Sequence, residues 1–181
     1  MEAPDEQLML AYREGDAGAF ETLYKRHRGA LYRFVLRALG STSSQKALAE
    51  ELYQEVWIRV IEARGRYTPQ ARFTTWLYTI AHNLLVDHWR KKGLTVVALD
   101  TEDVALESAN PARVAEGREA LARFMQALEA LPAAQREAFL LHEEAGLTVA
   151  EIAAATGAGE EAAKSRLRYA MAKLKAAVDE N

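Results

Sequence analysis

Residues 148–170, TVAEIAAATGAGEEAAKSRLRYA, predict a short helix, a tight turn and a second helix. Thr148 and Glu151 have the spacing of a capping box, in which each side chain accepts a hydrogen bond from a free amide at the helix start. Gly157 follows this helix and can adopt the positive φ that a tight turn demands. Ala153 is small at the point where the two helices would cross. This order of elements indicates a helix-turn-helix, whose second helix enters the major groove of DNA.

The second helix of this unit keeps Ala163 and Leu167 for packing. Its polar side chains then point broadly outward, as those of a major-groove reader do. These candidates for DNA contact are Glu161, Lys164, Ser165, Arg168 and Tyr169. The alternative is an ordinary helical hairpin with a solvated basic face. Glu160 and Glu161 count against DNA contact at the helix start, and they also stabilise the positive end of the helix dipole.

The rest of the chain also predicts helices, so the expected fold class is all-α. Two small helical domains, residues 1–93 and 113–181, are joined by a linker over residues 94–112, where the apolar periodicity is lost. In the first domain Asp16 can cap a helix. Further along, four apolar residues recur at every fourth position and predict another helix: Leu48, Leu52, Val56 and Val60.

Composition limits the classes of protein to consider. The chain has no Cys, which excludes disulfides and favours a reducing cytoplasm. No apolar run approaches the length of a membrane span, and the acidic N-terminus does not look like a signal peptide. The net charge of −3 argues against a protein that grips DNA unaided. Basic residues nevertheless cluster in residues 59–92 and 160–178, which suits a protein that touches DNA within a larger machine.

Aromatic and basic residues alternate in residues 64–92, and single-stranded DNA is bound by this combination of stacking and charge. Trp76 and Leu77 lie on the apolar stripe of the predicted helix and are expected in the core. The better candidates for DNA contact stand in the preceding loop, which Gly65 and Pro69 interrupt. They are Arg64, Arg66, Tyr67 and Arg72.

Three further stretches resemble, in order, segments of the sigma-70 family of bacterial RNA polymerase sigma factors. Residues 48–57, LAEELYQEVW, resemble the helix that binds the polymerase clamp. Residues 73–92, FTTWLYTIAHNLLVDHWRKK, resemble the segment that melts the promoter and recognises its −10 element. Residues 131–137, LPAAQRE, and the helix-turn-helix resemble the −35-binding domain. The chain has no room for an acidic inhibitory region or a middle domain, which points to the extracytoplasmic-function (ECF) group.

The resemblance implies a cytoplasmic, non-catalytic sigma factor that directs promoter-specific transcription initiation. It would bind core RNA polymerase at the β′ clamp and the β flap, promoter DNA, and an anti-sigma factor, without inserting into a membrane. The implied clamp-binding residues are Glu51, Leu52, Gln54 and Glu55. The loop of residues 64–72 would hold a base flipped from the −10 strand. Three residues of the following helix would lie close to that strand: Asn83, Asp87 and Arg90.

The chain departs from the family pattern at a few positions. Glu51 stands where Asp is usual, and His82 stands where Arg is common, which could weaken a phosphate contact. Ala158 and Ala163 replace larger aliphatic residues in the helix-turn-helix, so its packing could be looser.

Two other functions compete with this reading. A stand-alone regulator would use only the final helix-turn-helix, but it leaves residues 48–92 unexplained. A helical metal-dependent hydrolase would draw its ligands from four histidines: His27, His82, His88 and His142. The chain contains no His-Glu-x-x-His run, so we expect no enzyme, no metal and no cofactor.

Overall fold

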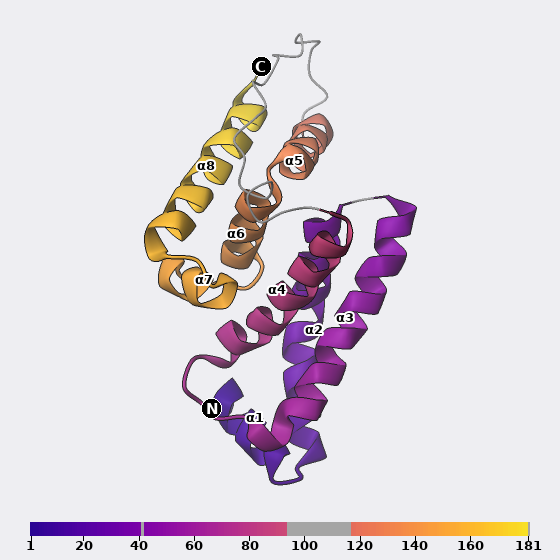
Figure 1. Ribbon diagram of the computed structural model, residues 1–181, viewed down its shortest axis with the longest axis vertical. Coiled ribbons are helices and arrows are strands. Elements are labelled where there is room, and N and C mark those ends of the chain that lie inside the picture. Colours follow the sequence, from indigo (N-terminus) through magenta and orange to yellow (C-terminus); the bar gives the residue numbers. More distant parts are fainter. Residues whose placement is uncertain (41, 94–116, 181) are drawn as a thin grey trace.

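A computed structural model describes residues 1–40, 42–93 and 117–180 of the chain. Every regular element in this part is a helix, which confirms the predicted all-α class (Figure 1). The predicted linker over residues 94–112 and the predicted start of the second domain at residue 113 lie outside the described residues.

The first bundle runs from residue 5 to residue 91 and is built around α2. Its elements are α1 (Asp5–Arg13), α2 (Ala17–Leu39), α3 (Ser43–Ala63), the 3-10 turn η1 (Arg64–Arg66) and α4 (Phe73–Lys91). Asp16 caps α2 as predicted, because its Oδ1 accepts a hydrogen bond from the amide of Ala19 at 3.2 Å. Helix α2 packs against α1, α3 and α4, and Phe34 and Leu77 are fully buried in the core between them.

Helix α3 begins before Leu48, the first residue of the apolar pattern that predicted it. Thr42 and Gln45 form a capping box, so the helix starts at Ser43. The predicted apolar stripe is only partly covered. Val56 and Val60 are fully buried, whereas Leu48 and Leu52 remain half-buried.

The second bundle contains α5 (Arg118–Ala130), α6 (Ala133–Glu143), α7 (Val149–Thr156) and α8 (Glu160–Asp179). Helix α8 packs against the other three, and α7, Gly157 and α8 form the predicted helix-turn-helix. Gly157 has a φ of +69°, the left-handed conformation that the turn requires. Four side chains of α8 are buried against its neighbours: Ala163, Leu167, Ala170 and Leu174.

The capping box at the start of α7 is present in the structure. The Thr148 hydroxyl accepts from the amide of Glu151 at 3.2 Å, and the Glu151 carboxylate accepts from the amide of Thr148 at 2.8 Å. Hydrogen bonding by the Thr148 amide holds the pKa of Glu151 below its ordinary value, and Arg72 contributes to the same effect. The first helix of the helix-turn-helix is therefore fixed by local chemistry as well as by packing.

Replacing Thr148 by Ala is expected to destabilise the second bundle, because the amide of Glu151 at the start of α7 loses the hydroxyl that accepts its hydrogen bond. The loss of such a cap costs about 1 kcal/mol, which lowers the melting temperature by about 4–8 °C in a domain of this size. Thermal unfolding followed by circular dichroism measures this change. Thr68→Ala, at an exposed loop threonine, is the control, and equal melting temperatures for the two variants would contradict the role of the cap.

Candidate polymerase-binding and DNA-binding surfaces

The outer face of α3 combines acidic and apolar side chains. Glu51 and Gln54 are exposed, Glu55 is half-exposed and accepts a hydrogen bond from Arg59 at 3.1 Å, and Leu52 is half-buried. Ile58 and Ile61 are 46% and 43% exposed. Steps of three and four residues separate these acidic and apolar positions, so they share one helix face. We call this set, residues 51, 54, 55, 58 and 61, the α3 face.

The sequence pattern missed the two isoleucines as surface residues. The apolar pattern of Leu48, Leu52, Val56 and Val60 did not include them, and the bundle buries Val56 and Val60 on another side of the helix. The sequence did contain a sign of their exposure, because the apolar stripe of α3 is wider than the face of a helix that packs against one neighbour. Two large apolar side chains next to acidic ones on an exposed helix are typical of a protein-binding surface.

Residues 64–72, which we call the arginine loop, connect α3 to α4 and present three cationic side chains. Arg64, Arg66 and Arg72 are exposed, as expected for residues that contact a DNA strand. The guanidinium of Arg64 lies over the ring of Tyr12, 5.1 Å from its centroid.

Tyr67 corrects the predicted set of loop residues. It is only 2% exposed, and its ring packs edge-on against Trp76 at 5.0 Å and against Phe73 at 6.5 Å. Burial raises the pKa of Tyr67 to about 12, and the Glu6 and Asp5 carboxylates add to the shift. The structure therefore argues against stacking of this ring on a DNA base. Alternation of aromatic and basic residues does not distinguish a stacking ring from a core ring.

Helix α4 carries the other residues expected near the −10 strand. Asn83, Asp87 and Arg90 are all exposed, and spacings of four and three residues place them along one stripe of the helix. Leu77 is buried and Trp76 is half-buried against Tyr67 and Phe73, which agrees with their predicted place in the core.

Helix α8 presents most of its predicted reading residues to solvent. Glu161, Lys164, Arg168 and Tyr169 are exposed, whereas Ser165 is half-buried. The guanidinium of Arg168 lies 5.2 Å from the centroid of the Tyr169 ring, a contact that orients both side chains. Two apolar side chains of this helix, Met171 and Val178, are 39% and 40% exposed.

The two bundles contact each other, α4 against α7 and α2 against α6 (Figure 1). Arg33 and Arg37 of α2 both pair with Glu144, at 2.9 Å in the case of Arg33. Arg72 of the arginine loop pairs with Glu151 at 3.3 Å. Residues of opposite charge on the two bundles therefore meet across this contact.

The most buried of these links joins His82 and Glu137. The Nδ1 atom of His82 lies 2.6 Å from Oε1 of Glu137, a carboxylate whose residue is only 4% exposed. A nearby phenol, that of Tyr78, has its pKa raised, first by burial and then by the Glu144 carboxylate. His82, where the family commonly has Arg, thus holds an acid of the other bundle.

Glu144→Arg is expected to separate the two bundles in the free protein. The nearly buried Glu144 carboxylate now pairs with Arg33 and Arg37, and the substitution would bring a third positive charge next to them. The side chains of Arg33 and Arg37 are partly exposed, so solvent reduces the cost to roughly 2 kcal/mol. Energy transfer between dyes on engineered cysteines, one per bundle, measures the separation, and the chain has no native Cys to interfere.

The neighbouring Glu143→Arg supplies a matched control for this experiment. It makes the same charge change one residue away, on a side chain that is 52% exposed and whose ion pair is to His142 of its own helix. We expect Glu143→Arg to keep the energy transfer of the wild type. Equal transfer in the two variants would contradict the part assigned to Glu144.

The histidines of the hydrolase alternative are engaged in separate contacts. His27 pairs with Asp5, His82 pairs with Glu137, and Nδ1 of His142 lies 3.0 Å from the carbonyl of Leu147. The pKa of His88 is lowered, first by burial and then by Lys92 and Lys91. Within residues 1–40, 42–93 and 117–180, no three side chains that could hold a metal ion come together. None of the helices in these ranges is long and apolar enough to cross a membrane.

Family models match both bundles. Residues 23–95 match sigma-70 region 2, and residues 121–174 match sigma-70 region 4, so the two matches span more than half of the chain. The chain belongs to the sigma-70 family. This confirms the resemblance drawn from residues 48–57, 73–92 and 131–137. It also confirms the expected function, which is that of a sigma factor in promoter-specific transcription initiation.

Curated relatives place the sigma factor in the ECF group. It is 35% identical over 92% of its length to the RNA polymerase sigma factor CarQ of Myxococcus xanthus, 93% of which is covered. It is 32% identical over 95% of its length to the sigma factor NccH of Alcaligenes xylosoxydans xylosoxydans, with 93% of that protein covered. It is 31% identical to the ECF sigma factor BldN of Streptomyces coelicolor over 90% of its own length and 61% of BldN.

Two solved structures resemble the whole fold of the sigma factor. CnrH, in complex with the cytosolic domain of CnrY, is 25% identical with a TM-score of 0.68, and the match covers 98% of each chain. The sigma factor RpoE of Bartonella quintana, in complex with the anti-sigma factor NepR, is 26% identical with a TM-score of 0.66. That match covers 90% of this sigma factor and 98% of RpoE.

The family matches contain all the predicted site residues of the sigma factor. The region 2 match holds the α3 face, the arginine loop and α4, and the region 4 match holds the exposed stripe of α8. Helix α1 precedes the region 2 match, although it packs against α2, α4 and η1.

Proposed function

We propose that the α3 face is the surface by which this sigma factor binds the β′ clamp of core RNA polymerase. Glu51, Gln54 and Glu55 supply charge, which sets orientation and association rate. Ile58 and Ile61 supply the apolar area that a protein interface buries at its centre. The observation that carries this proposal is the exposure of both isoleucines beside the acids, on a helix within the region 2 match.

The arginine loop and α4 would act on the −10 element. Arg64, Arg66 and Arg72 are exposed cations that can pair with the phosphates of a melted strand. The stripe of Asn83, Asp87 and Arg90 continues this surface along α4. Tyr67 would support the loop from within the core, because its ring is covered.

The second bundle would read the −35 duplex and contact the β flap. Lys164, Ser165, Arg168 and Tyr169 form the reading stripe of α8, and Glu161 lies at its start. Residues 1–93 would be the region 2 domain, residues 94–112 the linker and residues 113–181 the region 4 domain.

Promoter binding requires the two domains to separate. About 25 base pairs lie between the −35 and −10 positions, which is roughly 85 Å of duplex at 3.4 Å per base pair. In the structure, by contrast, Arg72 and Glu151 are 3.3 Å apart, and α7 directly precedes the reading helix. Residues 94–116, fully extended, would reach at most roughly 80 Å, which allows the domains to part. The arrangement in Figure 1 is therefore a closed form of the free protein.

The sigma factor would act as a non-catalytic specificity subunit in the cytoplasm, without a cofactor. An anti-sigma partner is supported by RpoE of Bartonella quintana, whose solved structure contains the anti-sigma factor NepR. A partner that binds the closed form would keep the −10 and −35 surfaces too close for a promoter.

Run-off transcription with purified core polymerase and a library of promoter fragments tests the proposed function. We expect specific transcripts that appear only when the sigma factor is added, together with co-elution of the protein and the core. If neither is observed, and the free protein binds duplex promoter DNA tightly, a stand-alone helix-turn-helix regulator becomes the better account.

A further inference from the structure

Helix α1 contacts the arginine loop at both ends, although it lies before the region 2 match and carries none of the predicted site residues. At the far end of the loop, Oε1 of Glu6 accepts a hydrogen bond from the amide of Phe73 at 2.6 Å. Phe73 is the first residue of α4, where backbone amides have no partner within the helix. The preceding residue, Arg72, provides no side-chain cap. A carboxylate from another helix therefore caps α4.

The near end of the loop is held by two other residues of α1. The Nη1 atom of Arg13 donates to the carbonyl of Tyr67 at 3.2 Å, and Tyr12 lies under the guanidinium of Arg64. Glu6 and Arg13 thus form hydrogen bonds with the backbone on either side of residues 68–72, the segment that carries Arg72. Because both contacts are to backbone atoms, they fix the path of the loop without engaging the guanidinium groups of Arg66 and Arg72.

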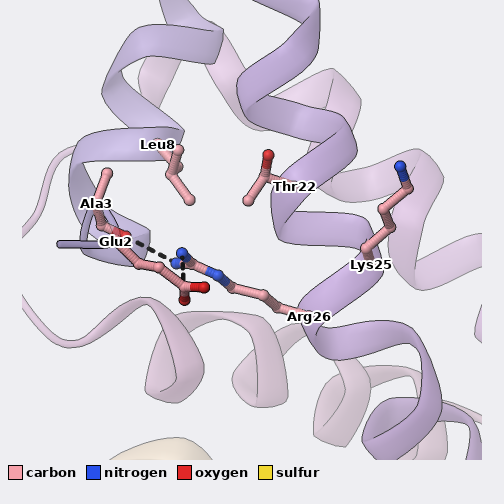
Figure 2. A pocket seen from close by; sticks show the side chains of 6 residues that line it. All are labelled: Glu2, Ala3, Leu8, Thr22, Lys25 and Arg26. Carbon is pink, nitrogen blue, oxygen red and sulfur yellow. Dashed lines mark hydrogen bonds and ion pairs between the residues drawn. The ribbon is translucent and has the colours of Figure 1, made fainter.

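Helix α1 is itself firmly attached to α2, so it can act as a support. Oδ2 of Asp5 lies 2.7 Å from Nε2 of His27, and Oδ1 of Asp5 accepts from Arg26 at 2.9 Å. The hydrogen bond to His27 is the main reason that the pKa of Asp5 is lowered. Arg26 also reaches the Glu2 carboxylate and the Ala3 carbonyl across a shallow recess (Figure 2). Met9 and Tyr12 are buried in the core.

We propose that Glu6 and Arg13 are positioning residues for −10 recognition, which hold the arginine loop in the shape that captures a base of the melted strand. This inference rests on the proposed function, because it assigns the loop to the −10 element. Neither side chain would touch DNA. Both residues act on the backbone only. The Glu6 carboxylate accepts from the first amide of α4, and the Arg13 guanidinium donates to the carbonyl of Tyr67 in the loop.

The test measures the affinity of the reconstituted holoenzyme for a single-stranded −10 oligonucleotide, taken from a promoter that the wild type transcribes. Glu6→Ala is expected to weaken this binding about tenfold, because a loss of about 1.4 kcal/mol, within the range that a helix cap contributes, is a factor of ten in affinity. Its affinity for core polymerase and for a −35 duplex fragment should stay within about twofold of the wild type. Glu6→Gln keeps an oxygen acceptor and should recover part of the loss, and Arg13→Ala should behave like Glu6→Ala.

The control and the contrary outcomes separate this role from a merely structural one. Glu2→Ala removes an exposed acid that pairs with Arg26 and should leave all three affinities unchanged. If Glu6→Ala weakens core binding and −10 binding equally, it only destabilises the domain, and the inference is wrong. Unchanged −10 binding in both Glu6→Ala and Arg13→Ala would also overturn it. A wild-type protein that opens no promoter with core would overturn the proposed function first.

Discussion

Replacing Glu51 and Glu55 together by lysine is expected to abolish binding to core polymerase and all sigma-dependent transcription. Both acids lie on the α3 face, beside the exposed Ile58 and Ile61, so each would be carried into the centre of the interface. Acidic residues on this face imply that the partner surface is basic. The two lysines would therefore place positive charges against positive charges. Like charges brought together at an interface cost several kcal/mol. At about 1.4 kcal/mol per tenfold change, affinity should fall by roughly two to three orders of magnitude.

Co-elution with core and run-off transcription measure this loss. Glu2→Lys with Glu21→Lys is the matched control, because it makes the same charge change on exposed acids outside α3. We expect the control pair to bind core as the wild type does. A second series, Ile58→Ala and Ile61→Ala, separates apolar area from charge and should weaken binding without changing its dependence on salt. Normal core binding by the Glu51→Lys, Glu55→Lys protein would rule out the α3 face as the polymerase site.

The second large effect is expected from Lys164→Glu combined with Arg168→Glu on α8. Both residues are exposed one turn apart, so their charges meet neighbouring phosphates or base edges. Each lost contact of this kind costs about 1–3 kcal/mol, and reversal adds repulsion from the DNA backbone. Transcription from a promoter that depends on its −35 element should fall by at least about a hundredfold.

Two comparisons make this second result specific. Core binding through the α3 face should be unchanged, because Lys164 and Arg168 lie on α8 of the other bundle. Lys175→Glu, at an exposed lysine two turns further along α8, should have a much smaller effect. If the double reversal and Lys175→Glu reduce transcription equally, the effect comes from overall charge rather than from the reading stripe.

The sequence predicted the helices well where capping residues mark a helix start and a glycine marks a helix end. Asp16 and Thr148 cap α2 and α7 as expected, and Gly157 makes the turn between α7 and α8. These features depend on residues within three or four positions of each other, so they can be recognised without the tertiary fold. Helix α1 was missed because no side chain caps its start, and its stability comes from burying Met9 and Tyr12 against other helices.

Candidate site residues were predictable when they needed only to be exposed and polar. Arg64, Asn83 and Lys164 lie at the surface as expected. Tyr67 was assigned wrongly because an aromatic ring between arginines suits both a stacking site and a core, and only packing against Trp76 decides. The pairing of His82 with Glu137 joins residues 55 positions apart, so no local pattern could have indicated it.

The contacts between the two bundles affect how binding responds to salt. A protein that covers phosphates releases counterions, and its affinity falls steeply as salt rises. Opening the closed form acts in the opposite direction, because Arg33, Arg37 and Arg72 lose their carboxylates and gather counterions from solution. The path from free chain to promoter complex should therefore show a shallower salt dependence than its number of phosphate contacts implies. A phosphate count taken from that slope would be too low by about the number of ion pairs broken on opening.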